Sequence, residues 1–251
     1  MTFWDHIDDL RKVIIRVVIV LVAATLSLFF FKDFLFNDLI LAPSRSDFFL
    51  YRLIGADFNL SLINIEVTAQ FMIHLKVTLI SALILTFPYL IYELWRFIAP
   101  ALYANEKRAV SKAFSFASIL FYMGLAVGYL VVFPLMLNFF VGYQLSPDIP
   151  NNFSLSSYIS LFSSIVLIFG IVFEFPTIIA VLSAMGVVTK EGMRSFRRYA
   201  ICAVVILAAV ITPSGDPFSL MVVSIPLYLL YEFSVLICRK GESAIDNVTE
   251  E

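Results

Sequence analysis

Glu174 is an acidic residue inside a long apolar stretch. Residues 167–173 before it are apolar, and Phe175 and Pro176 follow it. A carboxylate at the centre of a bilayer costs about 3 kcal/mol even on lenient scales, so we expect it to face water or a polar partner. Pro176 lacks an amide hydrogen, so we expect a helix kink at the same level. The pattern favours a functional contact, with a structural hydrogen bond to a neighbouring helix as the alternative.

Residues 92–108 combine aromatic side chains with a carboxylate. Trp95, Phe97 and Tyr103 are typical of the aromatic belt at a membrane interface, and Glu106 follows them. A carboxylate beside aromatic rings suits a cationic guest, preferably a guanidinium. Glu106 also lies just before the third apolar run, where a carboxylate stabilises a helix N-terminus. The residues alone leave both interpretations open.

The other polar residues exclude several classes of chemistry. The sequence has two histidines and two cysteines without metal-ligand spacing, and it has no nucleophile–base pair and no phosphate-binding loop. We therefore expect no metal, no cofactor and no enzymatic activity. The net charge of −2 shows no basic excess, which argues against a nucleic-acid partner.

A strongly apolar chain positions these residues. Of its 251 residues 61% are hydrophobic and 14% are charged. A soluble domain carries about 45–50% apolar and about 25% charged residues. The composition therefore predicts an integral membrane protein.

Six apolar runs are the expected transmembrane helices, because a helix needs about 20 residues to cross the hydrocarbon core. The runs are residues 13–31, 67–91, 113–141, 158–188, 199–211 and 218–238. They predict an all-α integral membrane protein with a single transmembrane domain over residues 1–251, in which spans five and six are short. The 13 residues of span five reach only about 20 Å, against a core of about 30 Å. We expect span five to lie in thinned bilayer or to line a wet cavity.

Prolines and basic residues predict the shape and orientation of these helices. Pro88, Pro134, Pro176 and Pro226 each fall inside a span, which predicts bent helices and a concave body. Thirteen basic residues fall in the N-terminal segment, after spans two and four and in the tail, against three in the first opposite loop. The positive-inside rule then places both termini in the cytoplasm. Glu232 would reach the cytoplasmic interface, and we favour an interfacial role for it over a functional one.

Several motifs together resemble the TatC family, the polytopic core subunit of the twin-arginine (Sec-independent) protein translocase. The resemblance covers nearly the whole chain. It rests on His6 with Asp9, Leu10 and Arg11, on residues 88–108, on Phe169-Gly170 with Phe173-Glu174 and Pro176, on Arg198-Tyr199, on Thr212-Pro213, and on Ile225-Pro226 with Leu230-Tyr231-Glu232. Two positions depart from the pattern, since Asp9 replaces the usual glutamate and Leu220 stands where a polar residue is common.

The resemblance implies a function. It implies recognition of twin-arginine signal peptides on the cytoplasmic face and export of folded proteins. The energy source for this export would be the proton-motive force. The implied partners are single-span subunits of the TatA and TatB type and other copies of the chain itself. The implied location is the bacterial cytoplasmic (inner) membrane.

The resemblance also assigns candidate site residues. The candidate residues for signal-peptide binding are Asp9, Arg11, Trp95, Phe97, Pro100, Leu102, Tyr103, Glu106 and Arg108. An intramembrane contact with a partner helix or the signal peptide falls on Phe173, Glu174 and Pro176. Docking of a partner helix falls on Tyr199, Thr212, Pro213, Asp216 and Glu232.

Three other classes of protein compete with this interpretation. A proton-coupled small-molecule permease also has an intramembrane carboxylate and bent helices, and it is the main alternative. An intramembrane protease would need a serine–histidine pair or two aspartates inside the spans, and the sequence provides neither. A purely structural assembly subunit fits the physical pattern as well.

Overall fold

The computed structural model describes residues 3–55, 60–101, 104–146, 148–149, 151–212 and 215–238. Side chains are described throughout these ranges except at residues 3–6, 101, 104–106 and 109. The described part is mostly helical.

Eight long or medium helices form the body. They are α1 (Phe3–Phe29), α3 (Ala69–Ile98), α4 (Ala104–Val127), α5 (Phe133–Gly142), α6 (Leu155–Val172), α7 (Phe175–Ala184), α9 (Arg197–Ile211) and α10 (Pro217–Ile237). The shorter elements are the π-helices η1 (Phe34–Ile40) and η4 (Gly128–Val132), the 3₁₀ helices η2 (Ala42–Ser44) and η3 (Ala99–Ala101), and the helices α2 (Phe49–Ile54) and α8 (Lys190–Ser195). The strands β1 (Leu62–Ile63) and β2 (Phe153–Ser154) pair in parallel.

Five helical stretches in the described part are long and apolar enough to cross a membrane. They are Ile7–Phe29, Ala69–Ile98, Val110–Gly142, Leu155–Ala184 and Pro217–Ile237. The 15 residues of α9 extend only about 22 Å, which is short of a hydrocarbon core of about 30 Å. Five of the six expected spans are thus found by length and composition, and span five, which corresponds to α9, stays a prediction.

The expectation of a short sixth span was wrong. Helix α10 has 21 residues and extends about 31 Å, enough to cross. It begins immediately after the turn because the side chain of Asp216 accepts a hydrogen bond from the Ser219 amide, and Pro217 occupies the first turn without losing a needed donor. Pro226 is accommodated within the helix.

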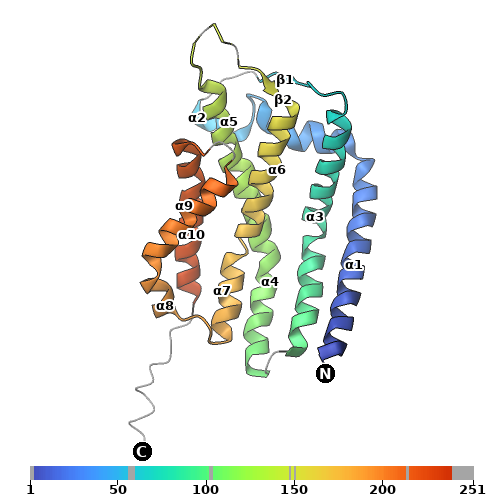
Figure 1. Ribbon diagram of the computed structural model, residues 1–251, viewed down its shortest axis with the longest axis vertical. Helices are drawn as coiled ribbons and strands as arrows, with labels where there is room; N and C mark the ends of the chain where they lie inside the picture. Colours follow the sequence, from blue (N-terminus) through green and yellow to red (C-terminus); the bar gives the residue numbers. More distant parts are fainter. Residues whose placement is uncertain are drawn as a thin grey trace, which may run out of the picture.

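The segments that connect the long helices lie at the two ends of the bundle. Figure 1 shows the start of α1, the α3–α4 connection, α8 and the end of α10 at one end. The opposite end carries η1, α2 and the two strands. The described basic residues near the start of α1, at the α3 and α4 ends, and from α8 to the start of α9 therefore lie together at the first end, below called the basic end. Its assignment to the cytoplasm stays a prediction.

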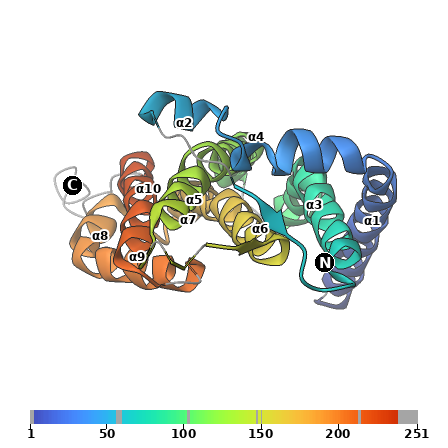
Figure 2. The ribbon, with the colours of Figure 1, turned by 90° about the horizontal axis from the view of Figure 1, so that it is seen from above.

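Seen from above, the helices form an elongated body. Helices α1 and α3 lie at one side and α9 and α10 at the other, with α4 and α6 between them (Figure 2). Helix α1 packs chiefly against α3, whereas α4 packs against α6 and α7, and α10 against α9 and α7. The largest buried side chains of the core include Phe121, Phe133 and Phe169. The central helices therefore contain the core and α1 lies at its edge.

Helices α4 and α6 approach closely at glycines. A Cβ atom added to Gly124 would lie 2.5 Å from the Phe169 carbonyl oxygen, and one added to Gly170 would lie 2.8 Å from the Phe121 ring. Small residues allow such contact between helices in a membrane, where packing replaces the hydrophobic drive of water. These two glycines thus set the spacing of the central pair.

Buried tyrosines hold the segment after α1 in place. The Tyr158 hydroxyl donates to the Ile40 carbonyl at 2.7 Å, and the Tyr51 hydroxyl donates to the Pro43 carbonyl at 2.9 Å. Burial raises the pKa of Tyr51, so its phenol stays a neutral donor. Tyr129 of η4 donates to the Leu39 carbonyl at 2.7 Å.

Candidate functional site

The end of α3 forms part of the basic end. The sequence placed Tyr92–Ile98 in a connection, but α3 continues through them to Ile98. No proline or glycine interrupts residues 89–98, and the helix ends only where Pro100 enters η3. Trp95 therefore lies on the last turns of a helix, with its ring 5.3 Å from the Phe114 ring of α4.

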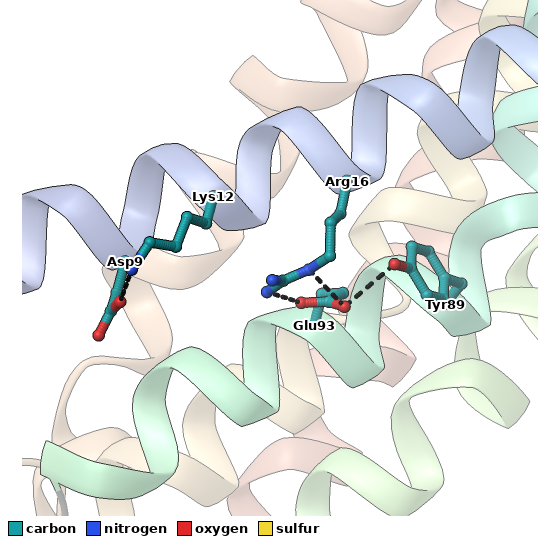
Figure 3. Close-up of polar contacts among 5 residues, drawn as sticks. All are labelled: Asp9, Lys12, Arg16, Tyr89 and Glu93. Carbon is teal, nitrogen blue, oxygen red and sulfur yellow. Dashed lines mark hydrogen bonds and ion pairs between the residues drawn. The ribbon is translucent and has the colours of Figure 1, made fainter.

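The buried Glu93 of α3 lies in a polar cluster with Arg16 and Tyr89, which are both half-buried. Its Oε1 accepts from Arg16 Nε at 3.1 Å and from the Tyr89 hydroxyl at 3.0 Å, and its Oε2 accepts from Arg16 Nη2 at 2.7 Å (Figure 3). The side chain of Glu93 is 3% exposed and that of Arg16 is 39% exposed. A two-point guanidinium–carboxylate pair of this kind is strong and directional.

The sequence reasoning did not find this cluster. In the sequence, Arg16 counts only among the basic residues of the N-terminal segment, and Tyr89 and Glu93 only as members of residues 88–108. Two signals were present: Tyr89 and Glu93 are four residues apart, on one helix face, and Arg16 lies inside an apolar run.

Asp9 and Arg11 lie near the start of α1. Asp9 Oδ1 lies 3.0 Å from Lys12 Nζ, and the two side chains are 47% and 65% exposed. An exposed pair of this kind contributes little, because solvent screens it and both side chains lose freedom. Asp9 can therefore exchange Lys12 for another cation, and Arg11 is exposed beside it.

Only part of the α3–α4 connection lies within the described residues. Leu102 and Tyr103 lie outside the described residues, and so does the side chain of Glu106. The backbone places Glu106 in the first turn of α4, which begins at Ala104, where the helix dipole favours a carboxylate. Pro100 and Arg108 are exposed on either side, and Phe97 is half-buried on α3.

Glu174 lies at a break between two helices. Helix α6 ends at Val172 and α7 begins at Phe175, so the expected kink is a two-residue break within the span Leu155–Ala184, with Glu174 as the N-cap of α7. Pro176 occupies the first turn of α7. Glu174 Oε1 is buried and has no hydrogen-bond partner in the described part of the chain, although Thr177 interacts with the carboxyl group.

An apolar groove lies beside this break. Two cavities of about 320 and 380 Å³ adjoin between α4, α7 and α10, and both are lined by Leu120 and Phe233. Pro176 and Thr177 line the first cavity, and Phe173 lines the second. The structure thus brings Phe173 and Pro176 to the wall of one groove, whose lining also includes Thr177, the residue that interacts with the Glu174 carboxyl group.

Glu232 of α10 has its own partners. Its Oε2 accepts from Arg197 Nη2 of α9 at 2.6 Å, and its Oε1 accepts from the Tyr228 hydroxyl at 3.0 Å. The tyrosine precedes the glutamate by four residues, as in the cluster around Glu93. Glu232 is therefore engaged within the chain, at the end of the α9–α10 pair.

The other docking candidates shape the turn between α9 and α10. Thr212 is buried and its hydroxyl donates to the Ala208 carbonyl at 2.9 Å, while Asp216 caps α10. Pro213 lies outside the described residues. Tyr199 is exposed, and the Arg198 guanidinium carbon lies 5.9 Å from the centre of its ring.

Known proteins resemble this chain over almost all of its length. The family model for TatC, the Sec-independent protein translocase protein, matches residues 5–226. The Sec-independent protein translocase protein TatC of Blattabacterium sp. subsp. Periplaneta americana (strain BPLAN) is 36% identical over 252 residues, covering 94% of each chain. The protein of the same name from Escherichia coli (strain K12) is 33% identical over 245 residues, covering 93% of this chain and 86% of that one.

Two crystal structures of the twin-arginine translocase receptor TatC have a similar fold. One aligns with a TM-score of 0.75 at 32% identity and covers 92% of this chain and 97% of that chain. The other, in DDM, aligns with a TM-score of 0.78 at 31% identity and covers 95% of this chain and all of that chain.

Proposed function

Because the chain belongs to the TatC family of Sec-independent protein translocase proteins, we propose that it binds twin-arginine signal peptides at the basic end. The chain is a multi-pass membrane protein and a subunit of a protein transport system, not an enzyme.

The proposed binding surface comprises the start of α1, the end of α3 and the start of α4. One observation supports it most directly: Asp9 is half-exposed and paired only weakly in the described structure, at the same end as the connection that carries Glu106. Two carboxylates suit two adjacent guanidinium groups, because each can form a two-point pair that lysine cannot reproduce. Trp95 and Phe97 add aromatic surface beside them.

Photo-cross-linking tests this proposal. A cross-linker is placed in turn at positions 92–108 of the full-length protein in membranes, and a labelled twin-arginine signal peptide or its Lys-Lys version is added. We expect cross-links to the twin-arginine peptide, with a sharp drop on Glu106→Ala and weak labelling by the Lys-Lys peptide. Equal labelling by both peptides, or no effect of Glu106→Ala, would rule out this receptor surface.

The groove beside Glu174 is the proposed contact for a partner helix or a deeply inserted signal peptide. The implied partners are single-span subunits of the TatA and TatB type, with further copies of this chain in the complex. A polar residue on such a helix would satisfy the buried Oε1, which has no partner in the described part of the chain. Tyr199 and the α9–α10 pair offer a second docking edge, where the short α9 would thin the membrane. The driving energy is the proton-motive force.

The proposed topology has six spans in one transmembrane domain, with both termini in the cytoplasm of a bacterium. The distribution of basic residues supports this orientation. The helices run so that α1 begins and α10 ends at the basic end (Figure 1). Accessibility of single cysteines at Leu10 and Ile63 to a membrane-impermeant reagent tests it: we expect Ile63→Cys to react from outside and Leu10→Cys only after lysis.

A proton-coupled permease is the second candidate, because a buried carboxyl oxygen without a partner also occurs in proton relays. The two functions differ in liposomes. A permease takes up solute on its own in response to a proton gradient, whereas the translocase subunit alone takes up none.

A further inference from the structure

Two clusters of hydrogen-bonded polar side chains at the basic end have the same arrangement. In each, a glutamate accepts from a tyrosine four residues earlier and from an arginine on an antiparallel helix. They join α1 to α3 through Glu93 and α9 to α10 through Glu232. The Glu93 side chain is 3% exposed and that of Glu232 is 28% exposed. The α1–α3 cluster is thus the more enclosed of the two.

Helix α1 depends on its cluster more than the other helices do. It packs chiefly against α3, and none of the residues in its most apolar stretch is buried. Apolar contact between helices in a bilayer has little net drive, since lipid tails are as apolar as leucine. An unpaired Arg16 or Glu93 in an apolar span would be strongly disfavoured. Phe29 of α1 also stacks on His74 at the other end of α3, so the ion pair is the specific determinant of how α1 sits on α3 at the basic end.

The same face of α1 carries Asp9. Asp9, Lys12 and Arg16 are spaced by three and four residues, which places them on one stripe, and Figure 3 shows all three projecting from the side that faces α3. Asp9 lies seven residues before Arg16, or about 10 Å along the axis. Since the helices are antiparallel, the same distance beyond Glu93 on α3 reaches Pro100 in η3.

We propose that Arg16, Tyr89 and Glu93 form a positioning cluster that fixes the register of α1 on α3 and so holds Asp9 beside the α3–α4 connection. Glu93 does not bind the signal peptide itself, because both of its oxygens are taken and it is buried. Glu93 instead affects how strongly the proposed binding surface prefers a twin-arginine peptide over its Lys-Lys version. This inference rests on the proposed signal-peptide function and deepens it.

Charge reversal tests the positioning role. The variants are Arg16→Glu, Glu93→Arg, the double variant with both exchanges, and the milder Tyr89→Phe, all in the full-length protein in nanodiscs. Two quantities are measured: the affinities for a synthetic twin-arginine peptide and its Lys-Lys version, and the distance between spin labels at Leu10→Cys and Lys107→Cys. Cys202 and Cys238 are replaced by serine in this background.

We expect each single reversal to weaken the twin-arginine affinity by about tenfold and to widen the distribution of label distances. The double variant should restore both quantities, and Tyr89→Phe should lower the arginine preference by about twofold. Lys76→Glu is the matched control: it reverses a charge on α3 at the opposite end, where Lys76 donates to Ser160, and it should change neither quantity.

Unchanged label distances in both single variants would overturn the inference, as would a double variant that recovers neither affinity nor distance. If a charge-reversed variant fails to fold, the milder Tyr89→Phe still tests the inference. An unchanged preference of this variant for the twin-arginine peptide would count against the positioning cluster. If the unmodified protein binds neither peptide, the proposed function fails. In that case the distances between the spin labels still test whether the cluster positions α1 on α3.

Discussion

The guanidinium of Arg16 and the carboxylate of Glu93 meet at two points, Nε to Oε1 at 3.1 Å and Nη2 to Oε2 at 2.7 Å, although 77 residues separate them in the chain. The contact joins the outermost helix to the body of the bundle. It lies on the face of α1 that carries Asp9 two turns away. One ion pair thus links the placement of a helix to the geometry of the proposed binding surface.

Removing Glu93 should destabilise the protein. Glu93→Ala leaves the half-buried Arg16 guanidinium without its partner inside an apolar span, and removing one member of a partly buried pair leaves the other charge uncompensated. We expect the melting temperature in detergent, followed by circular dichroism, to fall by several degrees. Tyr89→Phe removes a single hydrogen bond and should cause a clearly smaller shift. Equal shifts for the two variants would argue against the ion pair as the main determinant.

Neutralising Asp9 should weaken signal-peptide binding without affecting the fold. Asp9→Asn removes the charge that would pair with an arginine of the peptide, and we expect an affinity loss of about tenfold. Asp9→Glu keeps the charge and lengthens the side chain, so binding should be equal or tighter. Asp38→Asn is the control, since Asp38 is exposed at the opposite end. Titration with a labelled twin-arginine peptide measures all three, and a similar loss for Asp38→Asn would point to a general charge effect.

A methyl group at Gly124 should separate α4 from α6. Its Cβ would lie 2.5 Å from the Phe169 carbonyl oxygen, which is backbone and yields only if the helix moves. We expect Gly124→Ala to lower the free energy of unfolding by about 1–3 kcal/mol. Gly142→Ala is the matched control, because nothing lies within 4 Å of an added Cβ there. That variant should be neutral or slightly stabilising, and denaturant unfolding of the purified protein compares the two.

Substitution of Glu174 should separate assembly from folding. Glu174→Ala removes the carboxyl oxygen that lacks a partner in the described part of the chain, so the free protein should remain stable. Export of a twin-arginine reporter and recovery of the complex with its single-span partners should both fall. Ser183→Ala, a substitution of a buried hydroxyl farther along α7, controls for nonspecific loss of packing. Normal export and normal assembly in Glu174→Ala would remove Glu174 from the proposed partner contact.

Local patterns accounted for much of the fold. The apolar runs, Pro176 and the placement of basic residues each act through neighbours in the chain or through the bilayer, so the sequence determined the long helices, the break near Glu174 and the grouping of basic segments at one end. The motifs likewise indicated the family before any contact was known.

Other features depended on which helix faces meet. The sequence reasoning ended the second span at residue 91 because apolar character fades there. The structure continues the helix to Ile98, and within it Glu93 is buried and paired with Arg16 from another helix. In the same way Glu232 is paired by Arg197, while Glu174 keeps one buried oxygen that has no hydrogen-bond partner among the described residues.

The sequence by itself determined that this chain lies in a membrane, where most of its helices run and to which family it belongs. Only the tertiary structure decided which charges are neutralised within the chain and which are left for a partner. The physical reason is that burial and pairing depend on residues brought together from distant segments, as Arg16 and Glu93 are, whereas helix formation and membrane insertion depend on residues that are neighbours in sequence.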